Sequence, residues 1–312
     1  MIEIEHLCKR FGALTAVDDI SLTINRGEVL GFLGPNGAGK STTMKMVTGF
    51  LNPTSGTARV CGHDVLQDPL AVQRKIGYLP EGAPLYGDMT PYGLLKFVAE
   101  ARSIPKAERK AAIERVVSLV HIEKVLKQRI DTLSKGFKRR VGLAQAILHD
   151  PEVLILDEPT DGLDPNQKHD VRELIADMAK DKVILLSTHI LEEVAAVCTR
   201  AVIIANGQLR FDGTPAELQA MDPNHASVML TIKGAEDAHD ALAALSGVGQ
   251  VEAQDAPEGC TRYRVSPIDG ASILGGLSTL AHERGWEVDH LSVEEGRLDD
   301  VFRTVTAGPA RS

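Results

Sequence analysis

Short runs of apolar residues recur along the N-terminal part of the chain, and each run is bounded by Gly, Asp or Pro. They lie at residues 29–33, 153–156, 183–186 and 201–205. Apolar runs of this kind, without polar alternation, are typical of strands buried on both faces of a parallel sheet. The pattern therefore predicts a largely parallel sheet in the core.

Between these runs the apolar residues follow helical spacing. Helices are expected at residues 41–47, 92–101, 106–120, 139–148 and 167–179. Strands that alternate with helices indicate an α/β architecture. Because the segment 91–133 is helical in pattern almost throughout, we expect an inserted helical lobe at about 91–140.

The pattern breaks near residues 214–215 and again at 222–224, where Pro marks a linker. Beyond it, strand, helix, strand, strand, helix and strand are expected at 228–232, 235–245, 248–253, 261–265, 271–284 and 286–293. This order matches a small ferredoxin-like α+β unit, followed by a short helix at 298–305. The predicted domains are a large unit at 1–220 and an accessory unit at 226–306.

Composition narrows the classes of protein. The chain has 312 residues, of which 43% are hydrophobic, so it has ample material for a packed core. A net charge of -9 argues against a protein whose whole surface binds phosphate backbones, although it leaves room for a local basic cluster. The cysteines stand far apart in the sequence and indicate neither a disulfide framework nor a zinc site: Cys8, Cys61, Cys198 and Cys260.

Membrane insertion of the chain itself is not expected. Residues 1–5 alternate like a strand and lack the features of a signal peptide. The most apolar runs are far shorter than the roughly 20 residues that a membrane-spanning helix needs. We therefore expect a cytoplasmic protein whose membrane role, if it has one, comes through a partner.

A phosphate site is the clearest chemical signal. Residues 34–41 read Gly-Pro-Asn-Gly-Ala-Gly-Lys-Ser, directly after the apolar run 29–33 and before a helical segment, which is the P-loop pattern and context. Lys40 is expected to neutralise the β- and γ-phosphates, and the Ser41 hydroxyl to bind Mg²⁺. The nucleotide-binding residues expected here are Gly34, Pro35, Asn36, Gly37, Ala38, Gly39, Lys40, Ser41 and Thr42.

Polar side chains also end two other predicted strands. Asp157 and Glu158 follow the run 153–156, and His189 follows the run 183–186. In open α/β sheets, ligands bind at the carboxyl ends of the strands. We expect Asp157 to bind Mg²⁺, Glu158 to act as the general base, and His189 to reach the γ-phosphate.

Together these segments resemble the ATP-binding cassette of ABC transporters. The motif that other P-loop ATPases lack is Leu-Ser-Lys-Gly-Phe-Lys-Arg-Arg at 133–140, shortly before Asp157 and Glu158. The resemblance covers about residues 2–218, with the motifs in the family's order. It implies a P-loop NTPase fold with a helical lobe that binds ATP and Mg²⁺ and hydrolyses ATP.

The resemblance also implies roles for three residues outside these motifs. Phe11 matches the aromatic residue that stacks on adenine, and Asp164 matches the loop that crosses between the two halves of a dimer. Glu81 stands at the lid position, where most members of the family have glutamine. A carboxylate there can still bind Mg²⁺ or orient the attacking water.

Within the 133–140 motif, Ser134 is a plausible N-cap for a helix that starts near Phe137. Four basic residues lie near this helix start: Lys135, Lys138, Arg139 and Arg140. The helix dipole disfavours cations at this end, and a nearby anion would offset that unfavourable interaction. The resemblance implies that the anion is ATP held by a second copy, contacted by Ser134 and Gly136, and hence a homodimer. For Arg139 and Arg140, a solvated basic face is the alternative.

Several features are similar to the exporter branch that serves ABC-2-type membrane permeases, which includes gliding-motility and drug-export ATPases. They are Glu81, the segment 83–91, Phe137 in place of the family's usual glutamine, and the ending at 298–302. A separate permease chain is therefore the expected partner, and it would hold the protein at the inner face of the membrane. Apolar side chains of the lid suit a groove for a permease helix or pack on the helical lobe: Leu85, Tyr86 and Met89.

The function expected from this resemblance is an ATPase that couples dimer closure to substrate export. The alternative is an ABC ATPase that acts apart from transport, on ribosomes or DNA. One cassette and no long heptad run argue against that class, and no nucleic-acid partner is expected. A nucleotide-binding regulator without catalysis is disfavoured by Glu158 and His189.

Overall fold

The computed structural model describes residues 1–234, 238–268, 271–294 and 296–307. It divides into two compact units. The first comprises Met1–Pro215 and residues 305–307, and the second comprises Ala216–Thr304. Each unit has its own hydrophobic core. The domain boundary expected at 220–226 stays a prediction.

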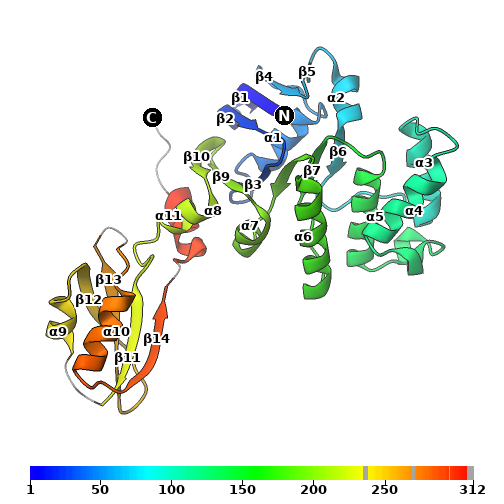
Figure 1. Ribbon diagram of the computed structural model, residues 1–312. Helices are drawn as coiled ribbons and strands as arrows, with labels where there is room; N and C mark the ends of the chain where they lie inside the picture. Colours follow the sequence, from blue (N-terminus) through cyan, green and yellow to red (C-terminus); the bar gives the residue numbers. More distant parts are fainter. Residues whose placement is uncertain (235–237, 269–270, 295, 308–312) are drawn as a thin grey trace. The chain divides into compact units, whose positions relative to one another are not determined.

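A mostly parallel six-stranded sheet forms the centre of the first unit, in the order β10-β9-β3-β8-β7-β6 (Figure 1). Only the edge pair β9 and β10 is antiparallel. The strands are β3 (Val29–Leu33), β6 (Ile76–Leu79), β7 (Val153–Asp157), β8 (Val183–Ser187), β9 (Arg200–Ala205) and β10 (Gln208–Gly213). The four predicted strands are the four central ones, which confirms the predicted parallel sheet.

An antiparallel sheet lies against this core, in the order β2-β1-β4-β5. Its strands are β1 (Ile2–Phe11), β2 (Leu14–Ile24), β4 (Ser55–Val60) and β5 (His63–Asp64). Buried side chains of this sheet, of the six-stranded sheet and of helix α1 (Lys40–Val47) form one core cluster. The sequence pattern indicated only the start of β1, because the register shifts of the β1 pairings break simple alternation.

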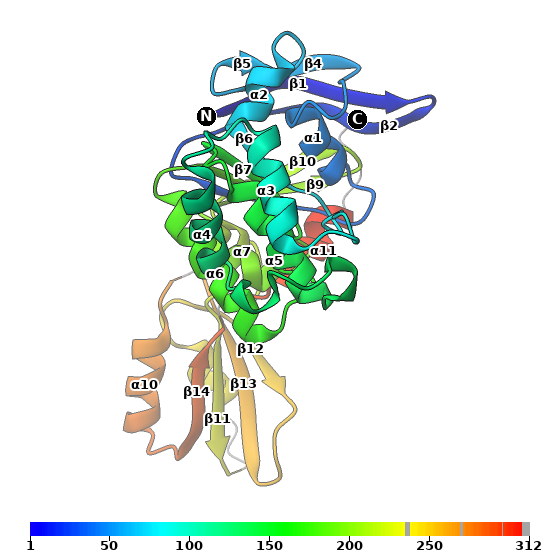
Figure 2. The ribbon, with the colours of Figure 1, turned by 90° about the vertical axis from the view of Figure 1, so that its right-hand side faces the viewer.

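The helical lobe contains α3 (Pro91–Ala101), α4 (Arg109–Leu119) and α5 (Lys135–Ile147), and these helices gather to one side of the six-stranded sheet (Figures 1 and 2). α5 begins before the predicted residue 139 because Ser134 caps it. Further α-helices of this unit are α2 (Pro69–Lys75), α6 (Pro165–Ala179) and α7 (Leu191–Val197). Helix α8 (Pro215–Gln219) begins at the boundary and lies mostly in the second unit.

The second unit is an antiparallel sheet with two helices packed into its core. The strand order is β12-β13-β11-β14. In chain order the elements are β11 (Val228–Lys233), α9 (His239–Ala243), β12 (Val248–Gln254), β13 (Cys260–Pro267), α10 (Leu274–Glu283) and β14 (Val288–Val293), followed by α11 (Leu298–Ala307). The start of the helix predicted at 235–245 lies outside the described residues.

Among the described residues, no helix combines the length and the apolar character needed to cross a membrane.

Two glycines allow a matched test of the antiparallel sheet. Gly56 has φ 73°, and a Cβ built on it would lie 2.0 Å from the His6 carbonyl oxygen. Gly62 has φ 81°, but a Cβ there would meet nothing within 4 Å. We expect Gly62→Ala to lower the free energy of unfolding by about 1 kcal/mol through backbone strain alone. Gly56→Ala should lower it by roughly 3 kcal/mol, because the strand must also shift.

Urea denaturation followed by circular dichroism measures both losses. Equal losses for the two variants would contradict the close approach of β4 to β1.

Candidate functional site

Polar segments follow four strands that are consecutive neighbours in the six-stranded sheet. The P-loop follows β3, His189 follows β8, Glu158 follows β7, and Glu81 follows β6. Since β3, β8, β7 and β6 run parallel, their carboxyl ends meet at one edge of the sheet. The fold therefore brings the predicted catalytic residues to the phosphate site.

The P-loop lysine is held by its own loop. Its Nζ atom donates to the carbonyl oxygens of Gly34 at 2.6 Å and Pro35 at 3.1 Å. Burial lowers the pKa of Lys40, while the charges of Glu158, Asp157 and Glu81 act in the opposite sense. The lysine is thus a partly desolvated cation, ready to exchange carbonyl oxygens for phosphate oxygens.

The glycines of the loop differ in what a Cβ atom at each position would contact. A Cβ on Gly34 would lie 2.3 Å from the Ile204 carbonyl oxygen, and one on Gly39 would lie 2.5 Å from that of Ala16. Gly39 is also the N-cap of α1, with φ 110°. A Cβ on Gly37, in contrast, would meet nothing within 4 Å. The loop is packed against the protein on one side and open on the other, which suits an anion at the start of α1.

Glu158 pairs with His189. One Glu158 carboxylate oxygen lies 2.8 Å from His189 Nδ1, and the Glu158 side chain is 16% exposed. Burial raises the pKa of the Glu158 carboxyl, whereas the hydrogen bond and the charge of His189 lower it. A carboxylate with a raised pKa, oriented by an imidazole, is well placed to accept a proton.

The backbone of Glu158 is unusual, with φ 54°. Its N–H donates to the Ser187 carbonyl oxygen at 3.0 Å, which ties the end of β7 to the end of β8. The neighbouring Asp157 is buried, and its carboxylate accepts a hydrogen bond from the Ser187 hydroxyl.

Asp157 and Ser41 supply the kind of oxygen ligands that Mg²⁺ prefers. Within the described part of the chain, no three His, Cys, Asp or Glu side chains form a group able to hold a metal ion. A magnesium ion at these residues would share its ligands with nucleotide phosphates and water. Glu81 is exposed at the start of the lid.

Arg139 and Arg140 correct an expectation. They were expected to face an external anion or solvent, but both are buried. Arg139 donates to the Pro80 carbonyl oxygen at 2.9 Å and to the carbonyl oxygens of Asp157 and Glu158. The Arg140 guanidinium donates to the carbonyl oxygen of residue 121 and stacks 4.4 Å from the Phe137 ring centroid. The terminal nitrogens of both guanidinium groups thus donate to partners within the chain, whereas the buried Nε atoms of both have no hydrogen-bond partner.

The other two cations also have internal partners. Lys135 pairs with Asp161 at 2.9 Å, and Lys138 donates to the Asp131 carbonyl oxygen at 3.0 Å. Ser134 caps α5 as predicted, since its hydroxyl accepts the Phe137 N–H at 3.3 Å.

Gly136 lies against the loop that follows Glu158. A Cβ on Gly136 would lie 3.3 Å from the Gly162 carbonyl oxygen. In the same loop, Asp164 caps α6 by accepting the Gln167 N–H at 2.9 Å. A role of Ser134, Gly136 and Asp164 toward a second copy stays a prediction.

Phe11 is 48% exposed, with Lys9 Nζ 5.1 Å from its ring centroid. The ring is open to a stacking partner, and its contact with adenine stays a prediction.

Glu193 is a site residue that sequence reasoning missed. Its buried carboxylate accepts hydrogen bonds from the hydroxyls of Thr160 and Thr188. It thereby joins the loop after Glu158 to the loop before His189. No sequence spacing marks this role, because it depends on the contact between α7 and two strand ends.

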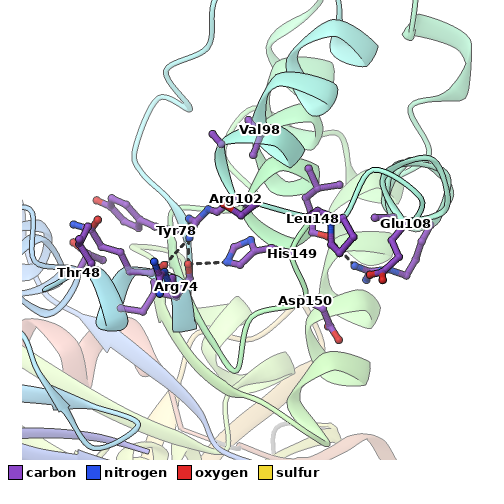
Figure 3. A pocket seen from close by; sticks show the side chains of 18 of the residues that line it. Thr48, Arg74, Tyr78, Val98, Arg102, Glu108, Leu148, His149 and Asp150 are labelled. Atoms are coloured by element: carbon purple, nitrogen blue, oxygen red, sulfur yellow. Dashed lines mark hydrogen bonds between the residues drawn. The ribbon is translucent and has the colours of Figure 1, made fainter. Parts of the chain in front are cut away.

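A cleft of about 1130 Å³ lies between the sheet and the helical lobe (Figure 3). Arg102 donates across it to the carbonyl oxygens of Gln73 at 2.6 Å and Ile76 at 3.3 Å. Burial lowers the pKa of His149 to about 4, so its imidazole is neutral at neutral pH. Two buried polar atoms of the cleft have no hydrogen-bond partner, Tyr78 Oη and His149 Nδ1.

Large apolar side chains are exposed at the cleft and on α3. Phe50 and Leu70 line the cleft and are mostly exposed. Tyr86 of the lid packs edge-on against Phe97 of α3, with ring centroids 6.1 Å apart, and both remain partly exposed. Leu85 and Met89 are half-buried. The sequence pattern pointed to the lid but not to the cleft.

The chain is similar to several known proteins. Residues 17–161 match the family described as ABC transporter. The linearmycin resistance ATP-binding protein LnrL of Bacillus subtilis is 30% identical over 312 residues, which is 100% of both chains. The Nod factor export ATP-binding protein I of Paraburkholderia xenovorans is 36% identical and covers 71% of this chain and 73% of its own.

Among solved structures, an ATP-binding subunit of an ABC transporter matches with TM-score 0.66 and 32% identity. The match covers 70% of this chain and 92% of that one.

The site predicts separate effects for two substitutions. Lys40→Ala removes the cation of the phosphate cradle, so nucleotide affinity should fall at least about 10-fold. Glu158→Gln keeps the shape of the side chain but removes the base, so ATP should still bind while turnover falls roughly 100-fold or more. Fluorescent-nucleotide titration and steady-state phosphate release measure the two effects.

Wild-type turnover by the Glu158→Gln protein would show that another group is the base. Unchanged nucleotide affinity of the Lys40→Ala protein would show that Lys40 does not contribute to phosphate binding.

Proposed function

Because this chain belongs to the ATP-binding subunits of ABC transporters, which bind and hydrolyse ATP, we propose that it powers export through a separate ABC-2-type permease. The whole-length similarity to a resistance ATP-binding protein and the similarity to an export ATP-binding protein support the direction. In this proposal the protein lies at the inner face of the membrane, held there by the permease.

One observation carries the catalytic part of the proposal: the P-loop, the Glu158–His189 pair and Asp157 meet at adjoining strand ends. Magnesium, when bound with ATP, polarises the γ-phosphate and offsets its charge. Lys40 holds the phosphates, and Ser41 and Asp157 hold the metal ion. Glu158 orients the attacking water and takes its proton, while His189 keeps the carboxylate in place.

The remaining predicted residues complete the nucleotide site in this proposal. Phe11 stacks on the adenine ring. Glu81 reaches the metal ion or the water from the lid. Ser134 and Gly136 contact the γ-phosphate bound to a second copy, and Asp164 lies at the boundary between the two copies. The exposure of the Ser134 residue supports this arrangement.

The cleft of Figure 3 is the proposed docking site for a short cytoplasmic helix of the permease. Its exposed Phe50 and Leu70 suit apolar side chains of such a helix. At its floor, Tyr78 Oη and His149 Nδ1 need hydrogen-bond partners that this chain does not supply. An amphipathic helix with a polar residue among its apolar anchors fits both requirements.

Dimerisation should depend on ATP. The Glu158→Gln protein holds ATP without consuming it, so we expect it to be monomeric alone and dimeric with saturating ATP and Mg²⁺. Sedimentation velocity at increasing ATP measures the change in mass. Adding Ser134→Ala should weaken the dimer roughly 10-fold by removing a charge-assisted hydrogen bond. A mass independent of ATP would exclude the shared site.

Docking is tested on the complex. Leu70→Asp places a charge in the apolar part of the cleft and should reduce co-purification with the co-expressed permease at least about 10-fold. Basal ATP hydrolysis by the isolated subunit should change less than about twofold, because Leu70 lies outside the nucleotide site. Ile268→Asp is a matched control at an exposed position of the second unit, 53% exposed.

If the Leu70→Asp protein recovered as much permease as the wild-type protein, the cleft would be excluded as the docking site. Failure of the wild-type protein to bind any membrane chain would contradict coupling to transport.

A further inference from the structure

Arg139 connects three segments from within the fold. It lies in the second turn of α5, is 4% exposed, and belongs to the helical lobe. One terminal nitrogen donates to the Pro80 carbonyl oxygen, directly before Glu81 of the lid. The other donates to the carbonyl oxygens of Asp157 and Glu158 at the end of β7. A single guanidinium thus joins the lobe, the lid and the catalytic strand end.

Glu158 needs such a restraint. A non-glycine residue with positive φ is strained by about 1–2 kcal/mol and keeps that conformation only when its surroundings impose it. In Glu158 the N–H is fixed by the Ser187 carbonyl oxygen, and the carbonyl accepts from Arg139 and from the Asp161 N–H. The direction of the Glu158 carboxylate depends on this backbone, because the carboxylate stands only a few bonds from it.

Arg139 also lies among acidic groups. Burial lowers its pKa, while the charges of Asp161, Asp157, Glu158 and Glu81 raise it. A buried arginine without such neighbours would be strongly destabilising. The guanidinium therefore offsets part of this negative charge, and Lys40 lies near three of the same carboxylates, Asp157, Glu158 and Glu81.

We infer that Arg139 is a positioning residue that holds the backbone of the catalytic base Glu158 and ties it to the lid. The inference rests on the proposed role of Glu158. Arg139 acts through the carbonyl groups that it binds within this chain.

The expected signature is a loss of turnover without a matching loss of binding. In the Arg139→Gln protein, kcat for ATP hydrolysis should fall about 100-fold, the size of effect that a small displacement of a catalytic group produces. The KM for ATP should change less than about threefold. Arg139→Lys should recover only part of kcat, because an ammonium group cannot reproduce the planar fork that binds three carbonyls.

Arg140 is the matched control. It is a buried arginine on the same helix that donates to the carbonyl oxygens of residues 120 and 121, away from Glu158. Arg140→Gln should lower the melting temperature as much as Arg139→Gln does, yet keep kcat within about threefold of wild type. Equal losses of kcat in both variants would mean that Arg139 supports the lobe as a whole, and would overturn the inference.

The Glu158→Gln protein separates the inference from its premise. If that protein is inactive while Arg139→Gln and Arg139→Lys keep wild-type kcat, the positioning role is wrong and the proposed function stands. If Glu158→Gln turns over ATP normally, the premise itself fails.

Discussion

Parallel alignment of β3, β8, β7 and β6 is the constraint on which the rest of this structure depends. The segments that follow parallel strands all lie at the carboxyl edge of the sheet, however far apart they are in the sequence. Residues 34–41 and residue 189 become neighbours for this reason alone. The antiparallel sheet on one side and the lobe on the other are connected to this edge through the core and through Arg139.

Charges at this edge are arranged before any ligand arrives. Lys40 is bonded to its own loop, Glu158 to His189, and the Asp157 carboxylate to the Ser187 hydroxyl. The side chains at this edge are therefore already held in place by partners of this chain. Groups held in this way need little reorganisation, which is where enzymes gain much of their electrostatic stabilisation of the transition state.

The sequence predicted the parts of the site whose chemistry is local. The P-loop and the strand ends at Asp157 and His189 are recognisable because their polar residues interrupt apolar runs. The roles of Arg139 and Glu193 depend on which carbonyl or hydroxyl lies opposite them, and that is decided by packing between distant segments. For this reason Arg139 looked like part of a basic surface. The cleft at Tyr78 and His149 was equally hidden, since it exists only between the lobe and the sheet.

The left-handed backbone at Glu158 affects which substitutions at this position would stabilise the fold. Glycine adopts that conformation without strain, so pressure for stability alone favours glycine at position 158. A glutamate at this position is less favourable for folding than glycine, and in the proposed mechanism it supplies the carboxylate of the base. Position 158 is therefore a place where stability and activity are in direct opposition. In a copy of this protein released from selection for turnover, it is among the first positions where substitution would make the fold more robust.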